Sequence, residues 1–230
     1  MQYMKEKLGA WQVGDDENSG KAKFRVFFPK EDTGLQHHIK SIQVIGDFQK
    51  ALDPAAKDWE PSLAPAMTKS PYPEGKGEEE EVGEIWEWQT PKELPKGFYQ
   101  YQYWVTFNDN TTRKVSDPCA RYGGLHNMDA AFVIGGSKPS DNPISPIKGG
   151  RKPLRDLVIY ELMIDDFTSE FRGKRAPLDA ACDKLDYLRD CGFNAILFMP
   201  WTAWNDDRFN WGYAPSFFYS VEYRYANDLN

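Results

Sequence analysis

The first half of the chain alternates between short runs rich in Val, Ile, Phe, Tyr and Trp and polar breaks rich in Gly, Pro, Asp and Asn. The runs are KAKFRVFFPK, IKSIQVIGDF, GEIWEWQT, GFYQYQYWVTFND and DAAFVIGG. Short β-prone segments separated by turn residues are typical of an all-β sandwich. Residues 53–81 contain SPYPEGKGEEEE, which is too polar and irregular for a strand, so we expect a long surface excursion there.

The pattern changes after the connector GSKPSDNPISPIKGGRKPLRD, residues 136–156. This stretch is rich in Gly, Ser and Pro and has no hydrophobic period, which indicates a linker. We therefore predict a β-sandwich over residues 1–135, a linker over 136–156 and a second domain over 157–230.

The second domain has a different pattern of hydrophobic residues. LVIYELMI, residues 157–164, is a near-continuous apolar run, typical of a strand buried on both faces of a parallel sheet. A single helix is predicted next, from Pro177 to the stop at Gly192, with one apolar stripe: Leu178, Ala181, Cys182, Leu185 and Leu188. NAILFMP, residues 194–200, is a second buried strand, so the three elements form a βαβ unit with a parallel pair.

Composition and charge narrow the class of partner. The 230 residues are 40% hydrophobic and 15% aromatic, which is enough for substantial cores, and the formal net charge is -7. Binding to nucleic acid or to an anionic membrane needs a surplus of clustered Lys and Arg, so neither partner is expected and a neutral substrate fits better. Without a signal-like start or a run of eighteen apolar residues, the prediction is a soluble, cytoplasmic protein.

The cysteines and histidines give no sign of a metal or a cofactor, and none is predicted. The three cysteines, Cys119, Cys182 and Cys191, are too few and too scattered for a disulfide framework or a zinc cluster. Cys182 and Cys191 fall on roughly opposite faces of the one predicted helix and cannot pair, so all three are expected to be small buried thiols. The histidines, His37, His38 and His126, lack metal-ligand spacing.

Three motifs in order carry a resemblance: VIYELMIDDFTSEFRG, then LDAACDKLDYLRDCGFNAILFMPW, then WGYAPSFFYSVEYRYA. Together they resemble the start of the catalytic (β/α)8 TIM barrel of the α-amylase superfamily, glycoside hydrolase family 13. The front half is similar to the immunoglobulin-like N-terminal module, of the carbohydrate-binding-module family 48 type, found in branching and debranching members; the matching stretches are LGAWQVG, FRVFFP, IGDF, LPKGFYQYQYWV and VSDPCARYG. The resemblance implies the N-terminal part of an enzyme that acts on α-glucans such as starch or glycogen by a retaining mechanism.

No catalytic residue is assigned. A retaining glycosidase needs two carboxyl groups about 5 Å apart, and in the family these groups follow later strands of a barrel of about 250 residues. Residues 151–230 supply two β/α units and the start of a third, so the chain alone is expected to be inactive. Asp165 and Asp166, as neighbours at the end of a strand, would point to opposite faces, and Glu161 is expected to be structural. The alternative is a non-catalytic α-glucan-binding or accessory protein.

The aromatic loop after the second strand holds the candidate substrate contacts. A sugar ring offers an apolar face to a flat aromatic side chain, and α/β folds place binding sites on such loops. Tyr213 in WGYAP matches the family position whose ring stacks under the sugar at the cleavage point, with core packing as the alternative. Gly212 would allow a tight turn and Trp211 would brace Tyr213. Trp211 and Trp204 are further candidates, for which packing is the alternative.

The other aromatic residues are expected to pack. The set in the C-terminal loop is assigned to the core or to a domain interface: Phe217, Phe218, Tyr219, Tyr223 and Tyr225. In the front module Trp59 matches the first tryptophan of a glycan platform, but the second position falls in NTTRKVSDP, which has no aromatic residue. Trp86, Trp88 and Trp104 lie in predicted strands, so a docking and structural role is favoured for this module over independent binding.

Overall fold

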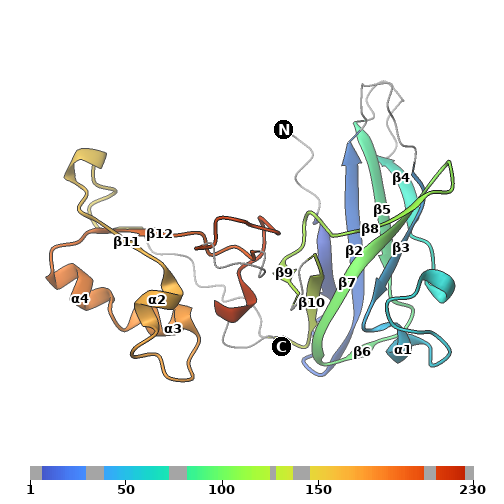
Figure 1. The fold of residues 1–230 in the computed structure, drawn as a ribbon, viewed down its shortest axis with the longest axis horizontal. Coiled ribbons are helices and arrows are strands. Elements are labelled where there is room, and N and C mark those ends of the chain that lie inside the picture. The colour runs from blue at the N-terminus through green and yellow to red at the C-terminus, as the bar shows by residue number, and fades with distance from the viewer. Residues whose placement is uncertain are drawn as a thin grey trace.

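The computed structural model describes residues 7–29, 39–72, 82–124, 128–136, 146–204 and 211–225. Figure 1 shows two antiparallel sheets on one side, a short parallel pair with its helices on the other, and the C-terminal segment between them.

Both sheets of the larger part are antiparallel. The first has the order β1 (Gly9–Val13), β2 (Ser19–Pro29), β5 (Gly83–Gln89) and β4 (Thr68–Tyr72), with β6 (Leu94–Pro95) also paired to β2. The second has the order β3 (Ile39–Gly46), β7 (Gly97–Phe107), β10 (Ala130–Ile134) and β9 (Tyr122–Gly123), with β8 (Thr112–Val115) also paired to β7.

The two sheets meet in one aromatic core. Phe24 of β2 is fully buried, and its ring centroid lies 5.1 Å from Tyr101 of β7 and 5.1 Å from Phe132 of β10, both edge to face. Along β2, Ala22, Phe24 and Val26 are buried while the residues between them are partly exposed. This alternation is what the period-two pattern predicts for a strand with one face in the core, and the all-β prediction for this part is confirmed.

The prediction of a strand-free excursion over residues 53–81 is wrong. The short helix α1 (Gln49–Leu52) precedes it, a 3-10 turn occupies Pro61–Leu63, and β4 pairs with β5 from Thr68 opposite Glu87 to Tyr72 opposite Gly83. β4 is an edge strand, which needs no apolar alternation and tolerates Pro71, so its polar sequence hid it. The glutamate run lies outside the described residues.

The smaller part contains the predicted parallel pair. β11 (Ile159–Leu162) and β12 (Ala195–Phe198) run parallel, with Ile159 opposite Ala195. A 3-10 turn, Leu154–Asp156, precedes them; α2 (Ile164–Thr168), α3 (Pro177–Cys182) and α4 (Leu185–Asp190) lie between the strands in sequence, and a last 3-10 turn occupies Tyr223–Tyr225.

The single predicted helix is two helices. The backbone N–H groups of Asp183 and Lys184 donate to Ala180 and Ala181, so each bond spans three residues and closes a tight turn that ends α3. The break rotates the predicted stripe, and Leu185 is exposed. The predicted ends hold, because Pro177 begins α3 and Gly192 has a positive φ of 96° after α4.

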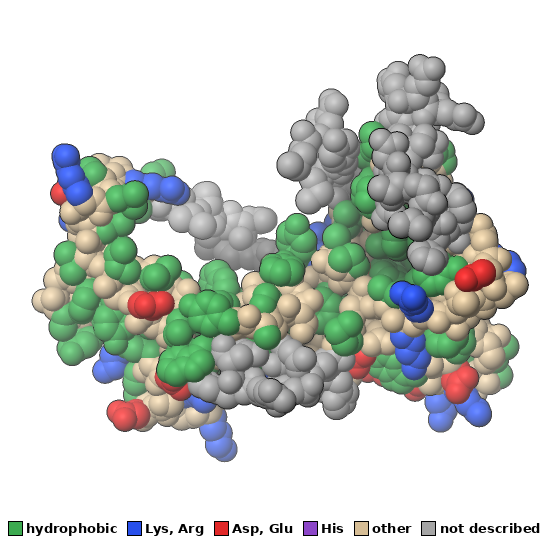
Figure 2. All heavy atoms as spheres, turned by 45° about the horizontal axis from the view of Figure 1, so that its top comes forward, with side chains coloured by type: hydrophobic (Ala, Val, Ile, Leu, Met, Phe, Trp, Pro, Cys, Tyr) green, Lys and Arg blue, Asp and Glu red, His purple; other side chains and the backbone are tan. Residues whose placement is uncertain are grey.

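Two further burial predictions are wrong in this part. Cys182 and Cys191 are exposed rather than buried, because each lies at the end of a short helix, while Cys119 is half-buried. The strands are not buried on both faces: Ile159 is 52% and Leu197 is 52% exposed. The described residues cover one face of the pair only, and Figure 2 shows hydrophobic side chains at the surface of this part.

Candidate functional site

The aromatic C-terminal segment, residues 201–204 and 211–225, is built against the edge of the sandwich. Val221 pairs in parallel with Tyr122 of β9, and Thr202 pairs antiparallel with Val221. Ser220 Oγ donates a buried hydrogen bond of 2.6 Å to the carbonyl oxygen of Ala120. The second sheet of the sandwich therefore continues through β9 into this segment, which lies beside β9 and β10 in Figure 1.

A strained turn presents the leading candidate, Tyr213. Gly212 has φ of 85°, and a Cβ atom there would collide with the carbonyl oxygen of Pro200, so only glycine fits. The expected tight turn is confirmed. Trp211 also has a positive φ, of 61°, which is unusual for a bulky residue. Tyr213 is 62% and Trp211 45% exposed, so Tyr213 does not pack in a core of the described residues.

Trp204 instead packs inside the segment. It is half-buried, its ring meets that of Tyr225 edge to face at 5.5 Å, and the Arg224 guanidinium lies 4.6 Å from its centroid. The smaller core against which it packs also contains residues from outside the segment: Leu162, Ile164 and Leu188. Packing, which was the alternative to substrate contact for Trp204, therefore describes its environment.

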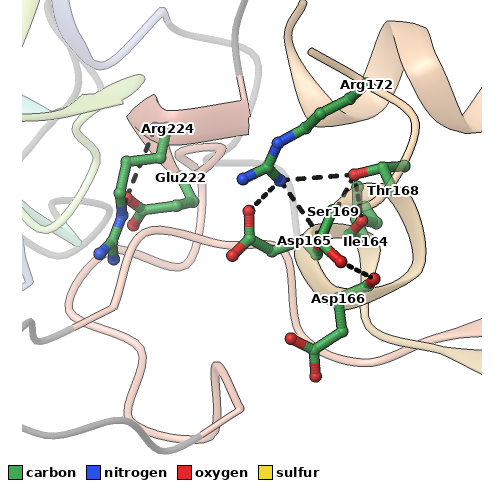
Figure 3. Close-up of polar contacts among 8 residues, drawn as sticks. All are labelled: Ile164, Asp165, Asp166, Thr168, Ser169, Arg172, Glu222 and Arg224. Carbon is green, nitrogen blue, oxygen red and sulfur yellow. Dashed lines mark hydrogen bonds and ion pairs between the residues drawn. The ribbon is translucent and has the colours of Figure 1, made fainter. Parts of the chain in front are cut away.

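Glu222, a buried carboxylate of the segment, was not predicted from the sequence. Arg224 Nε donates to Glu222 Oε1 at 2.6 Å (Figure 3). The backbone N–H of Trp204 donates to Glu222 Oε2 at 3.3 Å. The backbone N–H of Glu222 donates to Trp201 at 2.8 Å. A buried charge requires such partners. The only sequence signal was a Glu and an Arg two residues apart.

The two aspartates sit on a helix, not on a strand. Asp165 and Asp166 occupy the first turn of α2, and Asp165 is ion-paired with Arg172. In Figure 3 the Asp166 carboxylate points away from that of Asp165, so the prediction that the two do not converge holds, although its strand geometry was wrong. Glu161 on β11 is exposed.

The remaining aromatic residues divide by burial. Phe217 and Tyr225 are buried, as expected, and Tyr223 is half-buried, but Phe218 is 73% and Tyr219 64% exposed, so neither of these two packs in a core of the described residues. Phe217 enters the sandwich core and Tyr225 the smaller core, while Phe218 and Tyr219 face outward.

Tyr225 has an unusual hydroxyl. Within the described part of the chain this buried oxygen has no hydrogen-bond partner. Burial raises the pKa of Tyr225 to about 12, and the nearby negative charges of Asp165 and Glu222 act in the same direction.

The tryptophans of the sandwich give no exposed pair. Trp86 is buried, Trp88 and Trp104 are half-buried in β5 and β7 as predicted, and Trp59 is half-buried with φ of 65°. In NTTRKVSDP, where the second platform position falls, Thr111, Thr112 and Arg113 are exposed.

Metal and membrane features are as follows. The described residues contain no group of three His, Cys, Asp or Glu side chains that could hold a metal ion. The three histidines lie outside the described residues. No helix in the described ranges is long and apolar enough to cross a membrane.

Comparison with known proteins gives sequence relatives of one kind, although no family model matches. The chain is 30% identical over 127 residues to a malto-oligosyltrehalose trehalohydrolase of Saccharolobus solfataricus, covering 54% of this chain and 20% of that one. It is 26% identical to Pullulanase A of Streptococcus pneumoniae (56% and 13% covered) and 27% identical to the 1,4-alpha-glucan branching enzyme GlgB of Bacillus caldolyticus (82% and 26% covered). The chain thus spans about a quarter or less of these relatives.

Solved structures agree on the fold. A pullulanase from Bacillus acidopullulyticus aligns with 100% of this chain and 26% of its own at a TM-score of 0.60 and 20% identity. An apo pullulanase from Paenibacillus barengoltzii aligns with 99% of this chain and 33% of its own at a TM-score of 0.61 and 15% identity. These likenesses show a shared fold, and the sequence matches confirm the resemblance found in the sequence.

Proposed function

We propose, from the relationship of this chain to the α-amylase superfamily (glycoside hydrolase family 13), that it is the N-terminal part of an enzyme that cleaves or transfers α-glucans. The relatives that it matches are a trehalohydrolase, a pullulanase and a branching enzyme. In this proposal the sandwich is the immunoglobulin-like module over residues 1–135, residues 136–156 are the linker, and β11 to β12 open a (β/α)8 barrel over 157–230.

The observation that carries a substrate role is the exposed turn at Tyr213. Its ring is 62% exposed and is held by a glycine that no other residue can replace without a clash. A flat, exposed aromatic ring gives contact area to the apolar face of a sugar. Trp211, beside it, is 45% exposed and is the second candidate, and Trp204 packs against Arg224 and Tyr225.

The catalytic carboxyl groups of a retaining mechanism are not assigned in this chain. Glu222 is buried and forms an ion pair with Arg224, and Asp165 forms an ion pair with Arg172, so both carboxylates have structural partners. Carboxylates engaged in this way are not available as the acid and base about 5 Å apart that glycoside cleavage requires.

Two substitutions at Tyr213 test the proposal in the enzyme that carries this segment. Tyr213→Phe keeps the ring and should keep most of the turnover. Tyr213→Ala removes a contact that tightens in the transition state and should cost about 2–4 kcal/mol, roughly thirty- to a thousandfold in turnover on an α-glucan. The melting temperature of both should stay near that of the parent, because the side chain is exposed.

Tyr219→Ala is the matched control, since Tyr219 is 64% exposed in the same segment. It should leave turnover nearly unchanged. The proposal for Tyr213 is wrong if Tyr213→Ala has normal turnover per folded molecule, or if Tyr219→Ala is equally impaired.

A further inference from the structure

We infer that the β-sandwich is a positioning element for the Tyr213 turn, and that Gly123, Ala203 and Ser220 form the contact through which it acts. The inference rests on the proposed function for its catalytic consequence, but the contact itself is open to a separate test. None of the three residues is placed against substrate; each holds the segment that carries Tyr213.

The first observation is the absence of space between β9 and the segment. A Cβ atom on Gly123 would lie 2.7 Å from the Cβ of Ala203 and 3.6 Å from the ring of Phe217. Gly123 has no positive φ in this structure, so the backbone would accept another residue and the close approach alone requires glycine. Ala203 and Phe217 are buried in the same core as the rings of the sandwich.

The second observation is that the docking edge is fixed from inside the sandwich. Asp117 is fully buried, and its Oδ2 accepts hydrogen bonds from the hydroxyls of Tyr101 at 2.6 Å and Tyr103 at 2.8 Å. Asp117 Oδ1 accepts a hydrogen bond from the backbone N–H of Cys119 at 2.8 Å. The backbone carbonyl oxygen of Asp117 accepts one from the backbone N–H of Ala120. The Ala120 carbonyl that receives Ser220 is therefore held by side chains of the sandwich core.

The third observation links the docked residues to Tyr213. The N–H of Ala203 donates to Ser220, and the N–H of Ser216 donates back to Ala203 at 2.8 Å. Trp204 forms a bridge with Pro215, only two residues after Tyr213. A shift of Ala203 on the sandwich edge would move this bridge and with it the exposed ring.

Exchanging one methyl group across the contact tests the inference. Gly123→Ala introduces the clash, and the double variant Gly123→Ala with Ala203→Gly removes it while keeping the buried volume. Hydrogen exchange on this chain should accelerate about ten- to a hundredfold at the amides of Ala203, Ser216 and Glu222 in the single variant, and return to the parent rate in the double variant. The β7 amides should change little.

Gly97→Ala is the control for the cost of a methyl group elsewhere in the same sheet, since its Cβ would meet only the Tyr99 ring, at 3.3 Å or more. It should leave exchange in the segment unchanged. The inference is wrong if Gly123→Ala leaves those amides unaffected, if it accelerates β7 equally, or if the double variant is not rescued.

The catalytic consequence is tested in the enzyme that carries this segment. Gly123→Ala should lower kcat/KM, the double variant should restore it, and the loss should disappear in a Tyr213→Ala background, because a positioning effect has nothing left to position. If Tyr213→Ala itself has no effect, the proposed function fails, while the exchange experiment still decides the contact.

Discussion

At the scale of single residues, Tyr225 of the smaller core has a buried hydroxyl without a hydrogen-bond partner among the described residues. A buried polar group left unpaired costs about 1–3 kcal/mol, and Phe keeps the packing without that cost. Tyr225→Phe should therefore raise the free energy of unfolding by about 1 kcal/mol. Urea unfolding at neutral pH checks this, and a variant clearly less stable than the parent would show that the hydroxyl has a partner.

The effect of Tyr225→Phe on the free energy of unfolding should depend on pH in the alkaline range. The pKa of Tyr225 is raised by burial, and by Asp165 and Glu222, to about 12, whereas an unfolded tyrosine titrates near 10, roughly. Between these two pH values Tyr225 ionises in the unfolded chain but not in the folded one. The free energy of unfolding of the parent therefore falls as pH rises through this range. The advantage of the Phe variant should grow above about pH 10.

Single residues were predictable from the sequence where local geometry decides. Pro177 at a helix start and Gly192 and Gly212 at turns follow from backbone sterics, which need no knowledge of the rest of the fold. Phe218 and Glu222 were not predictable, because the exposure of one and the burial of the other depend on how residues 211–225 lie across two cores.

At the scale of elements, the pairing of β2 with β5 places Arg25 directly opposite Glu87. Arg25 Nη2 lies 2.9 Å and Lys23 Nζ 3.2 Å from Glu87 Oε2. Burial alone would raise the pKa of Glu87, but hydrogen bonds from Arg25 and Lys23, with their positive charges, outweigh it and lower the pKa. The stabilisation is therefore present above the usual Glu pKa and is lost as pH falls through the lowered one.

Glu87→Gln should reduce the free energy of unfolding at pH 7 by about 1 kcal/mol or less, since the side chains are partly exposed. The difference from the parent should fade as the pH falls from 7 through the usual Glu pKa of about 4.3 and then through the lowered pKa of Glu87. Denaturation across this pH range checks both statements. Glu17→Gln, at an exposed position, is the control, and a difference that survives at low pH would mean that charge is not its cause.

Elements were predictable where one face is buried against a large core. The alternation in β2 and the aromatic run of β7 are recognisable as strands in the sequence, because alternate side chains of each strand are buried in the core. β4 was missed because it is held by one neighbouring strand and needs no apolar residues. The helix before β12 was predicted as one because an apolar stripe does not reveal a tight turn at Asp183.

At the scale of the whole molecule, the two parts differ in how much they bury. β7 lies between β3 and β10 in its sheet, whereas β11 and β12 form a two-strand sheet with exposed apolar side chains. Amides in β11 and β12 should exchange about tenfold or more faster than those in β7. Equal protection in hydrogen exchange would contradict this and would indicate that the smaller part is as stable as the sandwich.

The continuation of the sandwich sheet from Tyr122 through Val221 to Thr202 has a consequence for recombination between relatives. The linker in the sequence suggests that the sandwich could be exchanged as a separate module. In space, however, the sandwich sheet is bridged to the C-terminal segment, and Ala203 and Phe217 of that segment lie in the sandwich core. A foreign sandwich spliced in at the linker would meet Ala203 with whatever side chain it carries in place of Gly123. Gly123 and Ala203 should therefore vary together among relatives. Chimaeras should fold well only when the sandwich and the C-terminal segment come from the same parent.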